Sequence, residues 1–268
     1  MQFMTFNLRF DNDADRENSW DRRRRQVIDL IERYAPSVLG TQEGTPRQLR
    51  YLRENLCGYA MHTPPERVWD ETCQYTTLFY RCGELRVSEG GECWLSKNPT
   101  VHRSKDWDSA YPRMMSYALC EPVGPGAGPL FWAVVTHLDN LGTEARVRQA
   151  GLISEWLGKR RQAPVVLMGD FNDAPGSTVH RLLTSPEFGL RDSWEVLGLG
   201  EGRESMTHHG FVGVPDICRL DWILLSGHFH VLDARIIRDH NEGRYPSDHF
   251  PYLVSCTVDC ARGGGATQ

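Results

Sequence analysis

Short apolar runs of strand type alternate irregularly with a few amphipathic helical stretches along this chain. Compact apolar runs and period-two alternation predict β-strands at residues 2–8, 38–41, 76–80, 85–87, 116–120, 130–136, 164–168, 220–225 and 252–258. Apolar residues at helical spacing predict helices over residues 22–34, 46–56, 144–161 and 177–183. Because many strands follow one another with no helix between them, the pattern favours a mixed, largely antiparallel α/β sandwich over a purely parallel sheet.

Four consecutive arginines, Arg22 to Arg25, open the first predicted helix. A helix distributes four successive residues over all its sides, so the run predicts a solvated face with one or two arginines pointing inward, rather than a patch for nucleic acid. A Gly- and Pro-rich stretch at 122–129 separates two apolar runs and predicts a long hairpin loop. The chain contains no repeat and no long linker, which indicates one domain over residues 1–260 and a frayed, disordered Gly-rich tail at 261–268.

Composition narrows the class of protein. Of the 268 residues, 40% are hydrophobic and 24% are charged, which is typical of a folded protein and excludes a disordered or collagen-like chain. The net charge of -5 weighs against a protein that binds duplex nucleic acid, because a basic surface supplies most of that affinity. No stretch approaches the roughly 20 apolar residues of a membrane span, and we find no signal-peptide pattern. Eight scattered cysteines without a CxxC pair favour free thiols. These features predict a cytoplasmic protein, with a monomer favoured.

Side chains of metal-ligand or acid–base type stand at the ends of several predicted strands. Any one of them is a weak signal, because carboxylates and amides at strand ends also cap helices and turns. Six such positions on one chain indicate a common cleft, to which a sheet can present polar groups without burying them. They are Asn7, Glu43, His137 with Asp139, Asp170 with Asn172, Asp221, and Asp248 with His249.

The blocks around these positions are Phe6-Asn7-Leu8-Arg9, Thr41-Gln42-Glu43-Gly44, Thr136-His137-Leu138-Asp139, Gly169-Asp170-Phe171-Asn172, Leu220-Asp221-Trp222-Ile223 and Pro246-Ser247-Asp248-His249. Their order resembles that of the endonuclease/exonuclease/phosphatase superfamily, the deoxyribonuclease I-like group of metal-dependent phosphoesterases. The resemblance runs from Met1 to about Val258. It implies a four-layer α/β sandwich, in which two mixed, mainly antiparallel sheets pack face to face and helices flank them. Within the family, the chain is most similar to compact bacterial members whose substrate is undefined.

The resemblance also implies a site for Mg²⁺ or Mn²⁺ as the cofactor. Glu43 stands at the family position of the principal metal ligand, with Asn7 and Asp248 nearby. Mg²⁺ prefers hard oxygen ligands and keeps several waters, so one or two carboxylates are enough to hold it. Asn7 either ligates the metal or orients the groups that do.

The family's catalytic residues match five positions of this chain. Asp170 and Asn172 correspond to the pair at the attacking water, where an ionised carboxylate accepts the proton and an amide fixes the orientation. His249, oriented by Asp221, resembles the family's histidine–aspartate pair, whose ring donates to the scissile phosphate or serves as acid or base. His137 resembles a second histidine found in the deoxyribonuclease branch.

Two candidate substrate-binding residues have an open interpretation. Arg113 matches a family arginine that reaches the phosphate, and a surface salt bridge is the alternative. His209 lies in a Thr-x-His-Gly-Phe block of the bacterial members, and it either contacts the substrate or belongs to a structural loop. The chain departs from the family at Gln74, where a carboxylate often supports the metal site or the second histidine. Either Glu71 replaces that carboxylate, or His137 has a weaker partner than in the nucleases.

Together these features predict a metal-dependent phosphoester hydrolase, a phosphodiesterase or phosphatase that activates water for attack on phosphorus. The net charge of -5 and the absence of a Lys-rich stretch favour a small-molecule phosphoester as the substrate. A DNA or RNA nuclease is the alternative, because the same catalytic set serves both, and a basic, aromatic-lined groove would indicate nucleic acid. A third hypothesis, an inactive protein on this fold, conflicts with the complete set of catalytic residue types.

Overall fold

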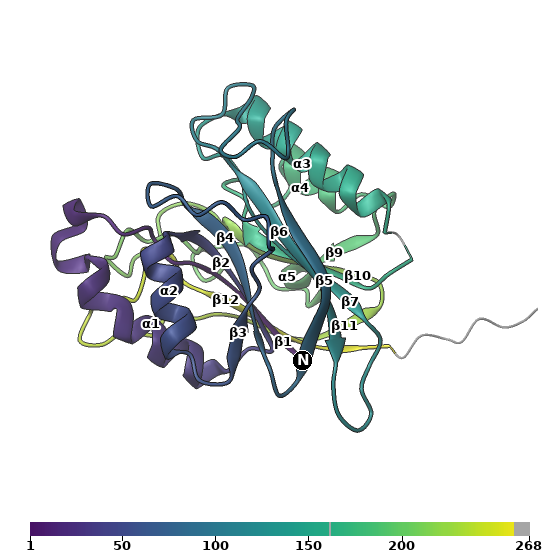
Figure 1. The fold of residues 1–268 in the computed structure, drawn as a ribbon, viewed down its shortest axis with the longest axis horizontal. Coiled ribbons are helices and arrows are strands. Elements are labelled where there is room, and N and C mark those ends of the chain that lie inside the picture. Colours follow the sequence, from purple (N-terminus) through teal and green to yellow (C-terminus); the bar gives the residue numbers. More distant parts are fainter. Residues whose placement is uncertain (161, 260–268) are drawn as a thin grey trace, which may run out of the picture.

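Two mixed sheets packed face to face form the centre of the molecule (Figure 1). The computed structural model describes residues 1–160 and 162–259, and within these ranges each sheet has six strands. The first sheet has the order β11-β12-β1-β2-β4-β3, with β1 (Gln2–Asn7), β2 (Val38–Gly44), β3 (Tyr59–Met61), β4 (Tyr75–Arg81), β11 (Phe229–Ile236) and β12 (Tyr252–Val258). The second has the order β5-β6-β7-β8-β10-β9, with β5 (Leu85–Trp94), β6 (Met114–Pro122), β7 (Phe131–His137), β8 (Val165–Asp170), β9 (Leu190–Asp192) and β10 (Asp221–Ser226).

Helices cover the outer faces of both sheets. The first sheet packs against α1 (Trp20–Tyr34) and α2 (Pro46–Asn55), and the second packs against α3 (Thr143–Gly158) and α4 (Thr178–Leu183). A 3-10 helix, η1 (Asp13–Asn18), precedes α1, and the short α5 (Ser193–Val196) follows β9. The order of layers is helix, sheet, sheet, helix, so the predicted four-layer α/β sandwich is confirmed.

The period of two along a strand explains how β1 serves two cores at once. Phe3 belongs to the cluster between the two sheets, where it packs edge to face with Phe131. The next residue, Met4, belongs to the cluster between the first sheet and helices α1 and α2, and so does Phe6. A third cluster lies between the second sheet and helices α3 and α4. A strand buried on both faces holds its C-terminal end in a fixed position.

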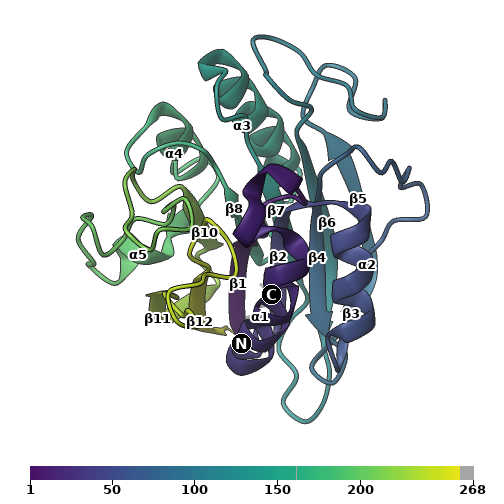
Figure 2. The same cartoon turned by 90° about the vertical axis from the view of Figure 1, so that its left-hand side faces the viewer.

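Strand pairing brings distant parts of the chain to the ends of β1 and β8. β1 pairs antiparallel with β12, so strands from opposite ends of the chain lie side by side (Figure 2). β1 is parallel to β2, and β7 is parallel to β8. A hydrogen bond of 3.0 Å from Asn7 Nδ2 to Asp170 Oδ2 joins the C-terminal end of β1 to that of β8. The polar strand ends of both sheets therefore meet at one end of the sandwich.

Gly169 allows β7 and β8 to approach closely beside this meeting point. The register pairs Thr136 with Gly169 and His137 with Asp170. A Cβ atom on Gly169 would lie 2.1 Å from the Thr136 carbonyl oxygen, well inside contact distance. Only glycine fits here without moving one strand, so the spacing between His137 and Asp170 depends on it.

The predicted strands are all present, and the loop expected at 122–129 connects the antiparallel β6 and β7. Three strands were not predicted: β3 and β9 have three residues each, and β11 is an edge strand with alternating charged residues. β5 extends to Trp94, past the predicted end at residue 87, with a register shift between Val87 and Glu89.

Two helix boundaries differ from the prediction by more than one residue. α1 begins at Trp20 rather than at 22, and α3 ends at Gly158 rather than at 161. Residue 161 and the expected tail at 261–268 lie outside the described residues. The arginine run contains one fully inward side chain, Arg23, which is 2% exposed. In the described part of the chain, no helix is both long enough and apolar enough to cross a lipid bilayer.

We expect Gly169→Ala to lower the free energy of unfolding by about 1–3 kcal/mol, the usual range for overpacking, because the new methyl group meets a backbone oxygen. Urea unfolding measures this difference. Gly151→Ala is the matched control: Gly151 lies in α3 with nothing within 4 Å of its Cβ position, so alanine should stabilise by up to about 1 kcal/mol. Equal stability of the two variants would contradict the prediction.

Candidate active site

Three candidate catalytic residues form a row across the second sheet. The register places His137 of β7 beside Asp170 of β8, and Asp170 beside Asp221 of β10. All three side chains are at least nine-tenths buried. The sheet thus fixes the backbone of each group, and the row lies at the ends of β7 and β8 and at the start of β10.

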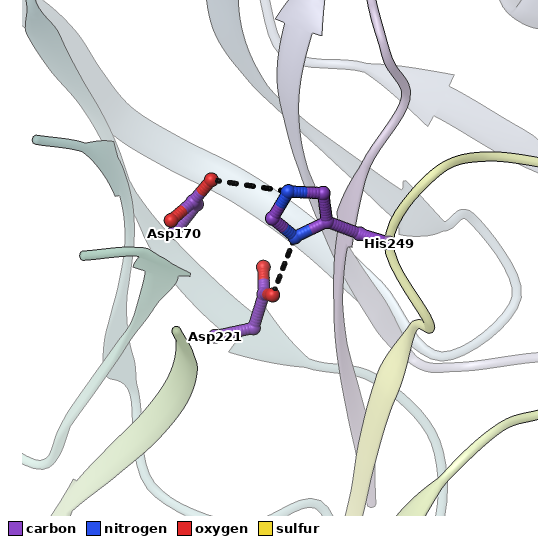
Figure 3. A group of neighbouring side chains, drawn as sticks. All are labelled: Asp170, Asp221 and His249. Atoms are coloured by element: carbon purple, nitrogen blue, oxygen red, sulfur yellow. Dashed lines mark hydrogen bonds and ion pairs between the residues drawn. The ribbon is translucent and has the colours of Figure 1, made fainter. Parts of the chain in front are cut away.

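His249 completes this row from the segment that precedes β12. Its Nδ1 lies 2.8 Å from Asp221 Oδ2, and its Nε2 lies 3.8 Å from Asp170 Oδ2. Figure 3 shows the imidazole between the two carboxylates. The other oxygen of Asp221, Oδ1, is buried with no hydrogen-bond partner among the described residues. The expected pairing of Asp221 with His249 is therefore present in the geometry.

Charges in this row shift the pKa values of its members. Burial lowers the pKa of His249, but the negative charges of Asp221 and Asp170 outweigh burial and hold that pKa well above its usual value. Burial raises the pKa of Asp170, and the neighbouring charge of Asp221 adds to this effect, bringing it to about 7. A carboxylate with a pKa in this range can accept a proton and release it again near neutral pH.

Asn7 links the two sheets at Asp170. Its Nδ2 donates to Glu43 Oε1 (3.2 Å) and to Asp170 Oδ2 (3.0 Å), and its Oδ1 accepts the backbone N–H of Arg9 (2.9 Å). These three partners fix which end of the amide is nitrogen, because two are carboxylates and one is an N–H. In this arrangement the Asn7 amide nitrogen holds the two carboxylates, and its oxygen accepts a backbone N–H.

Glu43 and Asp248 supply oxygen donors beside Asn7. Glu43 has a φ of 62°, a left-handed conformation that is strained for a side chain of this type, and its Oε2 accepts the backbone N–H of Phe10 (2.9 Å). Asp248 Oδ2 lies 3.8 Å from Arg9 Nε, and its Oδ1 accepts the Ser247 hydroxyl (3.2 Å). Hard, acidic oxygens with few internal partners fit Mg²⁺ or Mn²⁺.

Two clusters of side chains have ligand atoms close enough together to bind a cation. Both differ from the Glu43 and Asp248 site, because their ligand atoms already have partners within the protein. In Asp170, Asp221 and His249, the imidazole nitrogen Nδ1 is already occupied by Asp221. In the buried group around His180 and Asp192, the Arg219 guanidinium donates to both Asp192 oxygens, at 3.2 and 2.9 Å. The positive charge of Arg219 therefore already occupies the place of a cation in the cluster around Asp192.

The charged side chain nearest to His137 is a cation, Arg113, and not a carboxylate. Arg113 Nη1 lies 3.0 Å from its Nδ1 and 3.1 Å from its Nε2, and Asn172 Nδ2 lies 3.0 Å from its Nε2. Burial, followed by the charges of Arg113 and His249, holds the pKa of His137 well below its usual value. The ring is therefore neutral and can accept the proton of a neighbouring donor.

Arg113 is buried rather than exposed, so the surface salt bridge considered from the sequence is not what the structure has. Its side chain is 8% exposed, its Nη2 donates to Asn140 Oδ1 (3.1 Å), and its Nε lies 3.5 Å from Asp139 Oδ2. Glu71 does not replace the missing carboxylate at position 74, because it is exposed and paired with Arg50 at 2.9 Å. Gln74 itself lines the cleft.

The site opens into a cleft at the surface. The candidate residues Glu43, Arg113, His137, Asp170, Asn172, Asp248 and His249 line it. So do Arg9, Phe10, Gln74, Tyr111, Asn140, His208, Ile217 and Leu220, most of which the sequence did not single out. They come from loops, where no periodic pattern marks the side that faces the cleft.

The expectation that His209 contacts the substrate is not supported. His209 is 1% exposed and stacks on Phe250, with the ring centroids 3.9 Å apart, while its Nδ1 accepts the Gly213 N–H (3.2 Å). Its neighbour His208 lines the cleft instead and pairs with Asp216 at 2.9 Å. The structural-loop alternative therefore fits His209, because its side chain points into the aromatic packing behind the cleft.

Known proteins resemble this chain in sequence and in structure. A model of the Endonuclease/Exonuclease/phosphatase family matches residues 4–249. A solved protein of that family from Bacteroides thetaiotaomicron is 28% identical, with a TM-score of 0.86 over 97% of this chain and 98% of its own. A mannosyl-6-phosphatase of the same organism is 28% identical, with a TM-score of 0.84 over 96% of this chain and 100% of its own.

A more distant structure, the human Nocturnin catalytic domain, is 20% identical with a TM-score of 0.72 over 97% of this chain and 93% of its own, so it shares the fold. No curated protein sequence matches the chain. Because the family model spans most of the sequence and the fold agrees throughout, this protein belongs to the endonuclease/exonuclease/phosphatase family.

Proposed function

We propose that this protein is a metal-dependent hydrolase that cleaves phosphoesters of small molecules with a water activated by Asp170. The observation that carries the proposal is the surroundings of Asp170 Oδ2. This atom lies 3.0 Å from Asn7 Nδ2, 3.5 Å from His137 Nε2 and 3.8 Å from His249 Nε2. Hydrolases of this family share phosphoester chemistry, and these groups are of the kind that it needs.

Asp170 acts as the base in this proposal. Its Oδ1 accepts the backbone N–H of Asn172 (2.9 Å), so Oδ2 is the oxygen turned toward the water. The water oxygen forms a bond to phosphorus, its proton passes to Asp170, and the bond from phosphorus to the ester oxygen breaks. The alcohol then takes a proton from solvent as it leaves.

His249 stabilises the charge that develops on the phosphate. With Asp221 at Nδ1, the positively charged imidazole directs Nε2 toward Asp170 Oδ2. Because these two atoms are 3.8 Å apart, an oxygen beside the line that joins them can lie within hydrogen-bond distance of both. In this proposal His249 Nε2 donates to a phosphate oxygen and Asp170 Oδ2 accepts from the attacking water, so the two reacting groups lie next to each other.

Glu43 and Asp248 are the residues that would hold Mg²⁺ or Mn²⁺, and Asn7 keeps Glu43 and Asp170 in position. A bound divalent cation supplies charge neutralisation for the phosphate and the leaving oxygen. The two arginines of the cleft do not replace it fully, because Arg9 pairs with Asp15 (2.9 Å) and Arg113 lies near Asp139 (3.5 Å).

The cleft favours a small substrate over nucleic acid. Its lining includes the acidic Glu43, Asp170 and Asp248 and two arginines that already have carboxylate neighbours. Nucleic acid binding requires a basic track along the backbone, with aromatic side chains for the bases. The 28% identical mannosyl-6-phosphatase, whose name describes a small phosphorylated sugar, also supports a small-molecule substrate. A phosphorylated sugar or polyol is the substrate class that we propose.

The proposed active unit is a monomer in the cytoplasm. The seven cysteines that the structure describes are all free, and two of them, Cys57 and Cys82, are exposed. Free exposed thiols suit a reducing compartment.

A panel of phosphate monoesters, diesters, single- and double-stranded nucleic acids and phospholipids tests the function directly. With Mg²⁺ or Mn²⁺, we expect the highest kcat/KM on a sugar or polyol phosphate and little cleavage of nucleic acid. Faster hydrolysis of DNA or RNA than of any small ester would overturn the proposed substrate class and favour the nuclease alternative.

Treatment with EDTA should abolish hydrolysis, and added Mg²⁺ or Mn²⁺ should restore it. Glu43→Gln should raise the metal concentration for half-maximal activity by at least about tenfold, because it removes a charged ligand. Glu71→Gln is the matched control, since that side chain is exposed and paired with Arg50. Activity that survives both EDTA and Glu43→Gln would exclude a metal at this position.

Asp170→Asn should lower kcat by about 10²–10⁴-fold with little change in KM, because it removes the base but keeps the size of the side chain. Asp173→Asn is the control: Asp173 lies near Arg146 (3.7 Å) and does not line the cleft. Steady-state kinetics on the best substrate of the panel measures both. A kcat near that of the unchanged protein would assign the base to another residue.

Asp221→Asn should reduce turnover by about 10²-fold or more while leaving the melting temperature close to that of the parent protein, because the imidazole loses the charge that orients it. An exposed histidine–aspartate pair offers the comparison: Asp259→Asn breaks the contact with His230 (2.9 Å). We expect no change in turnover there. Equal effects of the two substitutions would show that Asp221 has no special role.

A further inference from the structure

One buried arginine of α1 donates only to backbone carbonyls near the active site. Arg23 is 2% exposed, and its Nε donates to Asn18 O (2.9 Å). Its Nη1 donates to Leu8 O and to Pro246 O, the latter at 3.0 Å, and its Nη2 donates to Arg9 O. A buried cation without such partners is very unfavourable, so these four carbonyls are what keeps the guanidinium in place. Burial still lowers the pKa of Arg23, to about 10.

Three of these carbonyls, those of Leu8, Arg9 and Pro246, belong to the two chain segments that carry the proposed metal-site residues. Leu8 and Arg9 directly follow Asn7, and Pro246 lies two residues before Asp248. One planar group from α1 thus holds the loop after β1 and the segment before β12 at a fixed separation. The segments are more than two hundred residues apart in the sequence, and the hydroxyl of Ser247 provides a second link by donating to Asn7 O (2.6 Å).

The contacts continue from Arg23 to the carboxylates. Arg9 has a φ of 49°, an unfavourable conformation for a residue with a side chain, and its carbonyl accepts Arg23 Nη2 and Gln48 Nε2, the latter at 2.8 Å. In this conformation the Arg9 N–H donates to Asn7 Oδ1, which turns Asn7 Nδ2 toward Glu43 and Asp170.

We propose that Arg23 is a positioning residue of the metal site, which fixes the orientation of Asn7 and the placement of Asp248 through the backbone. The inference rests on the proposed function, because it takes Glu43 and Asp248 as the metal ligands. Partners of metal ligands that make no contact with the metal commonly change affinity 10–100-fold when they are removed. Here the support passes through main-chain carbonyls, so no substitution at Asn7 or Asp248 reports on it.

Arginine suits this position better than lysine. The four hydrogen bonds to the carbonyls point in different directions, and a guanidinium has N–H donors that point in several directions within one rigid plane. A lysine ammonium has three donors at one point and cannot reach all the carbonyls spread around the edge of that plane. Arg23→Lys should therefore keep a buried positive charge but lose part of the bridge.

Mn²⁺ binding to the purified full-length protein, measured by electron paramagnetic resonance without substrate, tests the inference. We expect Arg23→Met to raise the Kd for Mn²⁺ by about 10–100-fold, and Arg23→Lys to give an intermediate value. Arg25→Met is the matched control from the same arginine run, because Arg25 is 68% exposed and pairs with Asp29. Unchanged affinity in a folded Arg23→Met protein would overturn the inference.

Hydrogen exchange separates positioning from a general loss of stability. It should increase at residues 7–10 and 247–249 in Arg23→Lys and remain unchanged in the strands of the second sheet. If Arg23→Met does not fold, then Arg23→Lys is decisive: affinity equal to that of the parent protein would overturn the inference. Glu43→Gln distinguishes the two proposals, because Mn²⁺ affinity unaffected by Glu43→Gln would refute the metal site itself, whatever Arg23 does.

Discussion

The burial of the Asp170 carboxylate is the constraint on which the active end of this protein depends. The residue is 1% exposed, and an unpartnered charge at such a depth costs several kcal/mol. Its partners come from separate elements: Asn7 ends a strand of the first sheet, Asn172 follows β8, and His249 precedes β12. Asn172 is a local partner, two residues along the chain, but only the fold brings Asn7 and His249 to Asp170. The two sheets have to meet at this end for the carboxylate to be tolerated, and the three cores hold them there.

The strand register that holds Asp170 in place also sets its charged neighbours, and these shift its pKa. β8 and β10 place Asp170 directly beside Asp221, so two carboxylates share one buried row. Burial and then the charge of Asp221 raise the pKa of Asp170, and the positive His249 between the two carboxylates opposes only part of that rise. Two residues near the row, Glu43 and Asn172, have left-handed backbone conformations, with φ angles of 62° and 50°. Such conformations cost roughly 1–2 kcal/mol each, so the rigid strands maintain a geometry that isolated loops would not adopt.

The sequence predicts the sandwich because the strands that matter are buried on both faces. β1 and β7 are buried almost throughout, with apolar residues at Phe3, Met4 and Phe6 and from Phe131 to Val135, and their ends are marked by Asn7 and His137. It predicts the catalytic row for the same reason, since strand ends can be located from the pattern. β11 was not predicted, because an edge strand needs no continuous apolar face and charged residues interrupt its apolar ones.

The rest of the cleft could not be predicted, because neighbouring loop residues differ only in the direction of their side chains. His208 and His209 are adjacent in the sequence, yet His208 lines the cleft and His209 stacks on Phe250. Phe250 lies forty-one residues later, so no local pattern contains the deciding contact. The arginine run posed the same problem. An inward arginine was expected, but the carbonyls that select Arg23 lie in segments at both ends of the chain.

Asp139 organises the substrate side of the cleft much as Arg23 organises the metal side. Its Oδ2 accepts the Tyr111 N–H (3.0 Å) and the Ser109 hydroxyl (3.2 Å), and its Oδ1 accepts the Gly142 N–H (2.7 Å). It also lies 3.5 Å from Arg113 Nε, and the Arg113 guanidinium is 5.4 Å from the Tyr111 ring. One buried anion thus fixes the exposed Tyr111 at the mouth of the cleft and the arginine beneath it. Because the charge of Arg113 is already balanced by Asp139, this wall adds little positive potential.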